Sequence, residues 1–169
     1  MLLVSARTET IHAHHCSMSN HHRLDGFDMS PATLEHEWVV TIDTPTAGVD
    51  NVTAALGARV PLVQGPYDNC LFVRDAGYQQ FRALEGSHAG DEGTLQRTAA
   101  SQIEFSIPPD RQLLSTVFDV VFEAHVNEEP TIRIHEAFGS RSKLLNDGDN
   151  PNRYWNRPDA AALHGDPTN

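Results

Sequence analysis

The segment of residues 102–138 limits most strictly how this chain can fold, because it combines three regular patterns in a fixed order. A strand is predicted over residues 102–107, where apolar and polar side chains alternate. A helix with one apolar stripe is predicted over residues 108–124, and its two prolines and aspartate suit a first helical turn. A second one-faced strand is predicted over residues 131–138.

The preceding part of the chain repeats this order. A strand is predicted from residue 37 to residue 42, then a helix over residues 49–56 that stops at Gly57, then a strand over residues 70–73. The polar, glycine-containing residues 75–96 predict a long loop or a loose hairpin. The complete order predicts an α+β, ferredoxin-like βαββαβ fold with two helices on one sheet face. The opposite face of the sheet would be exposed to solvent unless another subunit packed on it. The sequence therefore predicts a homo-oligomer, either a trimer or a dimer.

The two ends of the chain differ in composition from this core. Residues 1–36 contain a histidine-rich run and are predicted to form a flexible N-terminal extension. Residues 37–138 are predicted to form one domain, as the total length of 169 residues allows. Residues 139–169 are rich in Asn, Asp, Pro and Arg, and they predict a polar C-terminal tail.

The charge of the chain excludes some classes of partner. The net charge is −11, and residues 37–138 alone carry 15 acidic and 6 basic side chains. Such an acidic domain repels phosphate backbones, so no nucleic acid partner is expected. No apolar run approaches the roughly 20 residues of a spanning helix, so no membrane partner is expected. The two cysteines indicate no disulfide framework, and the expected location is the cytoplasm.

The turn after residue 124 carries the candidate metal ligands. His125 ends the predicted helix, and Glu128 and Glu129 follow at once. Imidazole and carboxylate groups suit a divalent ion such as zinc, manganese or iron, and Cys70 adds a candidate sulfur ligand. The alternative is a well-capped corner, in which the histidine lies on the helix dipole and the acids are solvated. The histidine-rich N-terminal run is a separate candidate for metal binding.

Several blocks of residues 37–138 resemble, in the same order, the YqfO-like and CutA-like proteins. The blocks are GPYDNC at residues 65–70, QFRALEGS at 80–87, the glycines at 90 and 93, IEF at 103–105 and the closing His125-x-x-Glu128-Glu129-Pro130. The family commonly has Pro-Tyr where this chain has Val126 and Asn127. The same domain occurs as an insert in the Nif-three-like proteins, whose dinuclear metal site lies in the flanking halves and is not carried over.

The resemblance implies a PII/CutA-like fold and a tendency to oligomerise, without an established catalysis. One expected function is a non-enzymatic, oligomeric domain that binds a divalent metal ion or a small effector, with residues 75–96 as a lid. The alternative is a structural or protein-interaction module in which the turn at His125 seals a subunit interface. A metal-dependent hydrolase is a third hypothesis.

Overall fold

The computed structural model describes residues 25–143, 147–148, 150 and 153–163. The histidine-rich run at residues 12–22 therefore lies outside the described residues. The strands are β1 (Phe27–Met29), β2 (Ala32–Pro45), β3 (Phe72–Arg82), β4 (Leu95–Ile107) and β5 (Thr131–Ser142). The helices are α1 (Val49–Arg59) and α2 (Arg111–Ala124), with short 3-10 turns η1 (Thr46–Gly48), η2 (Tyr154–Asn156) and η3 (Ala160–Leu163).

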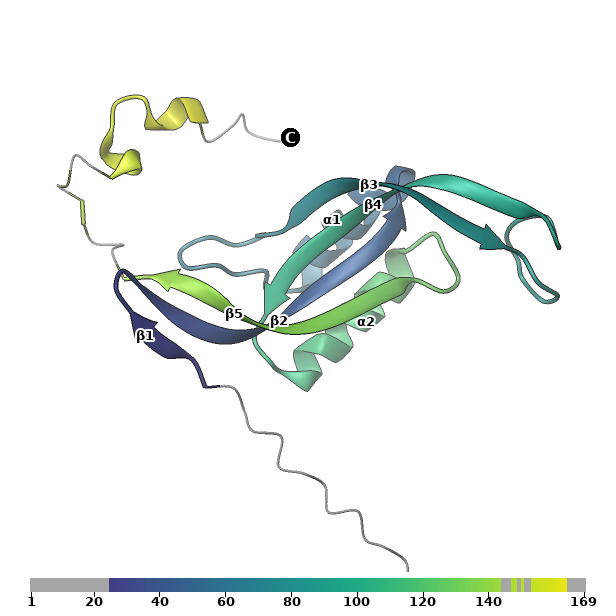
Figure 1. Ribbon diagram of the computed structural model, residues 1–169, viewed down its shortest axis with the longest axis horizontal. Coiled ribbons are helices and arrows are strands. Elements are labelled where there is room, and N and C mark those ends of the chain that lie inside the picture. The colour runs from purple at the N-terminus through teal and green to yellow at the C-terminus, as the bar shows by residue number, and fades with distance from the viewer. Residues whose placement is uncertain (1–24, 144–146, 149, 151–152, 164–169) are drawn as a thin grey trace, which may run out of the picture.

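The strands form one antiparallel sheet in the order β3-β4-β2-β5. Helix α1 connects β2 to β3, helix α2 connects β4 to β5, and both helices lie on the same face of the sheet (Figure 1). Because β5 pairs with β2 over residues 32–43, the small strand β1 occupies the other edge of β2, beyond the end of β4. This is the ferredoxin-like arrangement, so the predicted fold class is confirmed.

The core lies between the sheet and the two helices. The apolar residues of the amphipathic strands and helices that the sequence predicted lie in this core. Helix α2 starts at a side-chain cap, because Asp110 accepts hydrogen bonds from the backbone amides of Gln112 (2.7 Å) and Leu113 (3.2 Å). The fully buried apolar residues are Val40, Ile42, Val52, Leu56, Ile103, Val117, Val120 and Val121.

Helix α1 continues past Gly57, where the sequence predicted a stop. A side chain at Gly57 would run into the amide of Asn69, so this glycine serves close packing instead of ending the helix. The helix ends at Arg59, and Val60 is already extended (φ −112°, ψ 126°). The following Pro61 explains this end, since a residue before proline disfavours the helical conformation.

The stretch predicted as a long loop or loose hairpin is mostly a regular hairpin. Strand β3 runs to Arg82 and β4 begins at Leu95, so only residues 83–94, the hairpin loop, connect them. A shift in register between Asp75 and Gly77 interrupts the pairing once, and Gly77 adopts a positive φ of 112° there. Strand β2 also begins earlier than predicted, at Ala32, and β5 continues to Ser142. The division of the chain at residues 36 and 138 remains a prediction.

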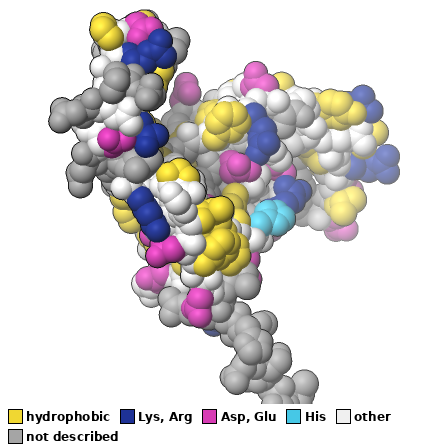
Figure 2. Space-filling view, turned by 60° about the vertical axis from the view of Figure 1, so that its left-hand side comes forward, with side chains coloured by type: hydrophobic (Ala, Val, Ile, Leu, Met, Phe, Trp, Pro, Cys, Tyr) yellow, Lys and Arg dark blue, Asp and Glu magenta, His cyan; other side chains and the backbone are white. Residues whose placement is uncertain are grey.

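The face of the sheet opposite the helices is polar. Glu37 is buried there, and its carboxylate accepts hydrogen bonds from Ser106 Oγ (2.8 Å) and from Arg141 Nη2 (3.0 Å). Two further ion pairs cross between neighbouring strands, Arg133–Asp43 and Arg74–Glu104. Figure 2 shows acidic and basic side chains next to each other on the face that it presents. None of the helices in the described residues is long and apolar enough to cross a membrane.

Candidate functional site

A groove of about 570 Å³ lies where the end of β2, strand β3, the hairpin loop and the α2–β5 turn meet. Its lining combines apolar side chains with amides and carboxylates. The lining residues are Asp43, Tyr78, Gln79, Gln80, Phe81, Arg82, Ala83, Leu84, Ser87, Ala89, Asn127, Glu128, Glu129 and Thr131. The groove therefore includes two of the four predicted metal ligands, Glu128 and Glu129.

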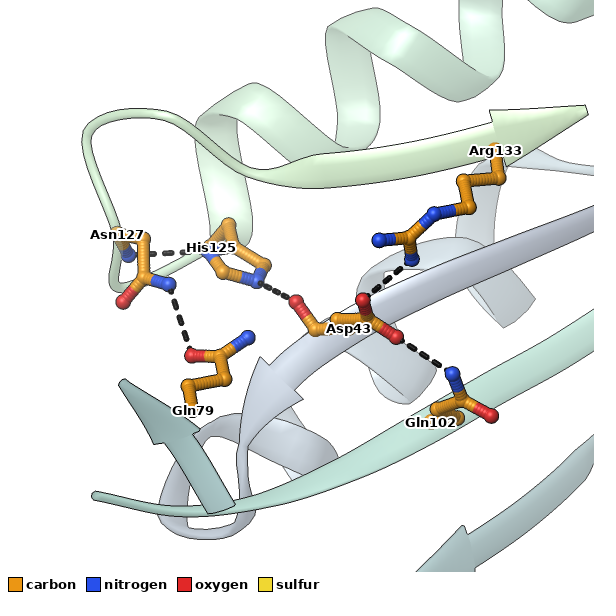
Figure 3. Close-up of polar contacts among 6 residues, drawn as sticks. All are labelled: Asp43, Gln79, Gln102, His125, Asn127 and Arg133. Carbon is orange, nitrogen blue, oxygen red and sulfur yellow. Dashed lines mark hydrogen bonds and ion pairs between the residues drawn. The ribbon is translucent and has the colours of Figure 1, made fainter. Parts of the chain in front are cut away.

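His125 supports one wall of this groove with both of its ring nitrogens. Its Nε2 lies 3.1 Å from the backbone oxygen of Asp43, and its Nδ1 accepts a hydrogen bond from the backbone amide of Asn127 (2.9 Å) (Figure 3). Because a carbonyl oxygen only accepts, Nε2 carries a proton, and the lone pair of Nδ1 accepts the amide hydrogen of Asn127. His125 thus fastens the α2–β5 turn to the end of β2.

The side chain of Asn127 connects the same turn to strand β3. Its Nδ2 donates to Gln79 Oε1 at 3.3 Å. Asp43, at the end of β2, receives Gln102 Nε2 (2.7 Å) on one carboxylate oxygen and Arg133 Nη1 (2.5 Å) on the other. Figure 3 shows these residues as one chain of contacts from β3 through the turn to β5. The groove walls are consequently held by side chains from four strands.

Glu128 ties the hairpin loop to the turn. Its Oε1 accepts the backbone amide of His88 (2.9 Å) and also lies 2.6 Å from His88 Nδ1. Both side chains are solvent-exposed. Glu129 is exposed as well and lines the groove without a salt bridge to any described residue. The predicted lid is therefore a hairpin loop anchored at one carboxylate.

Cys70 lies in a different groove, on the polar face of the sheet beside Glu37, Phe72 and Glu104. Its thiol is free and lies 3.6 Å from the backbone oxygen of Asp68. Within the part of the chain that the structure describes, no three His, Cys, Asp or Glu side chains gather as a ready metal site. A metal ion at His125 would have to displace the Asn127 amide or the Asp43 carbonyl. The metal-ligand assignment of His125, Glu128, Glu129 and Cys70 remains a prediction.

Sequence reasoning did not identify Asp43 and Gln79 as parts of the site. From the sequence, Asp43 is predicted only to lie in the turn after a strand. Its role in the site depends on its backbone oxygen and on two side chains far away in the chain, which residue types alone do not reveal. Asn127 was visible as a departure from the Pro-Tyr of the family pattern. In this chain the asparagine supplies both an amide donor to Gln79 and a backbone amide to His125.

No protein-family model matches the chain, and no curated protein matches it in sequence. A Bacillus cereus protein related to NIF3 has a similar structure, with 26% identity and a TM-score of 0.52 over 67% of this chain and 29% of that chain. CutA1 from Oryza sativa shares 13% identity over 62% of this chain and 82% of its own, with a TM-score of 0.44. CPII from Thiomonas intermedia K12, solved with ADP and bicarbonate, shares 19% identity over 64% and 92%, with a TM-score of 0.41.

The chain spans less than a third of the length of the NIF3-related protein. The solved structures similar to it include the three groups that its sequence resembles, namely NIF3-related, CutA and PII-like proteins. Together with the strand order of the sheet, the NIF3-related match confirms the resemblance at the level of the fold.

Proposed function

We propose that this chain is a non-enzymatic, oligomeric CutA/PII-like domain that binds a small effector in the groove at the α2–β5 turn. The observation that carries this proposal is the meeting of β2, β3 and the turn around one hollow of about 570 Å³. Small-molecule sites commonly have volumes of about 300 to 1,000 Å³ and combine apolar walls with a few placed polar groups. Here Tyr78 and Phe81 provide the apolar walls, and Gln79 and Asn127 provide the polar groups.

The hydrogen bonds of His125 and Asn127 make this groove largely preformed. A ligand then loses less of its binding free energy to the ordering of loops and side chains. The hairpin loop, tied to Glu128 through His88, closes the groove at one end. Since this tie is exposed to solvent, it is weak and can open for entry of a ligand.

The test is a thermal-shift screen of untagged protein against a panel of organic metabolites. A ligand present at about 100 times its Kd stabilises the folded chain by about 2.7 kcal/mol. We expect this stabilisation to disappear in Glu129→Ala and Phe81→Ala, which change the groove lining, and to persist in Glu136→Ala, which changes an exposed glutamate on β5. A stabilisation that all three variants retain would place the ligand elsewhere and overturn the assignment of the groove.

A divalent cation is the second candidate ligand, because Asp43, Glu128 and Glu129 line the same groove. Carboxylate oxygens suit manganese better than zinc among the expected ions. Metal content of untagged protein, measured for the native chain, His125→Ala and Glu129→Ala, separates the alternatives. Loss in both variants supports the His125 site, and loss in Glu129→Ala alone supports a carboxylate site. Metal that stays bound in both point variants and is lost only when residues 1–28 are removed is bound by the histidine-rich run.

The oligomeric part of the proposal is supported by the hairpin that projects beyond the rest of the sheet (Figure 1). It keeps four large apolar side chains exposed, namely Tyr78, Phe81, Leu84 and Leu95. Apolar side chains gathered on one projection are typical of a contact surface. If no ligand binds in the groove and this hairpin still controls the assembly, the interaction-module hypothesis replaces the effector-binding one.

A further inference from the structure

The groove at the α2–β5 turn runs along a free strand edge. Strand β3 ends the sheet and pairs only with β4, so its other edge has no neighbouring strand among the described elements. Residues 78–82 of β3 all line the groove, although the side chains of a strand alternate between its two faces. A groove that is lined by consecutive strand residues follows the edge itself, where side chains of both faces and the backbone reach it.

This edge offers backbone groups that no described residue satisfies. In an antiparallel pair, every second residue directs its N–H and C=O groups away from the partner strand. Within the described part of the chain, residues 78–82 form backbone hydrogen bonds with β4 alone. Free edge groups of this kind are docking sites for extended peptides, which add one more strand to a sheet.

Two free charges of opposite sign lie on the two walls of the groove. Arg82 ends β3 on one wall, and Glu129 lies in the α2–β5 turn on the other. Both side chains are exposed, and neither forms a salt bridge or a hydrogen bond with the described residues. The other two acids of the lining, Asp43 and Glu128, already have hydrogen-bonding partners of their own. The groove thus keeps one cation and one anion for a ligand.

The placement of these two charges suits a ligand of a few residues. Asn127 of the turn reaches β3 at Gln79, three residues before Arg82. Glu129 follows in the same turn, two residues after Asn127. Three residues of a strand span about 10 Å. An extended tripeptide places its ammonium and carboxylate groups about as far apart.

We propose that the small effector of this groove is a short peptide with free ends, which adds to the edge of β3 as an extended strand. This inference rests on the proposed function, since it names the ligand class of the same groove. The peptide backbone pairs with the open N–H and C=O groups of β3. Its ammonium group pairs with Glu129 and its carboxylate with Arg82, so the two charged contacts select peptides by length.

Isothermal titration calorimetry of the untagged chain with tripeptides of the form Ala-X-Ala tests the two charged contacts. We expect the free tripeptides to bind about tenfold more tightly than their N-acetylated or C-amidated forms, each of which lacks one charge. Glu129→Gln removes the discrimination against the N-acetylated form only, and Arg82→Gln removes the discrimination against the amidated form only. Arg111→Gln and Glu136→Gln are the controls, because both change exposed charges outside the groove.

Hydrogen exchange tests the strand pairing separately. A bound tripeptide slows the exchange of backbone amides within residues 78–82, whereas a ligand held by side chains alone leaves their exchange unchanged. If these amides are already protected without peptide, and the protection grows with protein concentration, a second copy of the chain occupies the edge and the inference is wrong.

The outcomes separate this inference from the proposed function. If a metabolite that is not a peptide binds in the groove and no tripeptide does, effector binding stands and the peptide assignment is wrong. Peptide binding that Glu129→Gln and Arg82→Gln both leave unchanged also overturns the inference. If neither tripeptides nor metabolites bind, effector binding in the groove fails, and the inference fails with it.

Discussion

At the scale of single residues, His125 stabilises the fold through both ring nitrogens. His125→Ala leaves the Asp43 carbonyl and the Asn127 amide without their partner, so we expect the free energy of unfolding to fall by about 2 kcal/mol. Urea denaturation measures this change. The matched control is His135→Ala, an exposed histidine on β5, with an expected effect within about 0.5 kcal/mol. Equal effects of the two variants would contradict the supporting role of His125.

The Glu37 side chain leaves no room for a side chain at position 139, which is a glycine in this protein. A Cβ at this position would lie 2.5 Å from Oε1 of Glu37, whose carboxylate is buried and held by Ser106 and Arg141. Gly139→Ala therefore destabilises the fold by about 1 to 3 kcal/mol, as overpacking does. Gly148→Ala, where the added group meets nothing within 4 Å, is the control. Thermal or urea unfolding of both variants checks the difference.

At the scale of elements, strand β1 is tied to the end of β5 by Asp28. The hydrogen bond from Lys143, and next that from Thr33, lowers the pKa of Asp28 below its ordinary value. Because the pKa is lower in the folded state, this tie stabilises the fold at neutral pH. It is lost as the pH falls below about 4 and through the folded pKa.

We expect Lys143→Ala to raise the pKa of Asp28 towards its ordinary value, because it removes the largest cause of the shift. An NMR titration of the side-chain carboxyl carbons measures this change. Arg153→Ala is the control, since Arg153 lowers the pKa of Asp147 instead. An Asp28 titration that stays the same in Lys143→Ala would show that the tie does not form in solution.

The elements that pack on the core could be predicted from the sequence, and the others could not. Strand 102–107 and the second helix show a one-faced pattern because one side of each is buried. The outer part of the β3–β4 hairpin has both faces towards solvent, so its sequence lacks alternation and resembles a loop. For the site, the turn at His125 was predictable from residue types. Its partners were not, since two of them are backbone atoms of residues 43 and 127.

At the scale of the whole molecule, the projecting hairpin is expected to control assembly. Tyr78→Ser combined with Leu84→Ser removes two of its exposed apolar side chains, so we expect a lower mass of the assembly by light scattering. Val63→Ser is the control, because Val63 is similarly exposed (54%) but lies in the loop before β3. An unchanged mass in the hairpin variant would exclude the hairpin as a subunit contact.

Strand β2 has neighbours on both edges over residues 38–43, where β4 and β5 pair with it at the same positions. Successive backbone amides of an antiparallel strand point to opposite neighbours, so the amides of residues 38–43 are directed alternately at β4 and at the edge strand β5. Fraying of β5 exposes only those directed at β5, whereas the amides directed at β4 exchange with deuterium only when β2 and β4 separate in the middle of the sheet. Strand β1, paired at three positions only, can open by itself. Deuterium uptake at the β2 amides directed at β4 thus measures the opening of the sheet through its middle, and uptake at β1 measures only the detachment of this N-terminal strand.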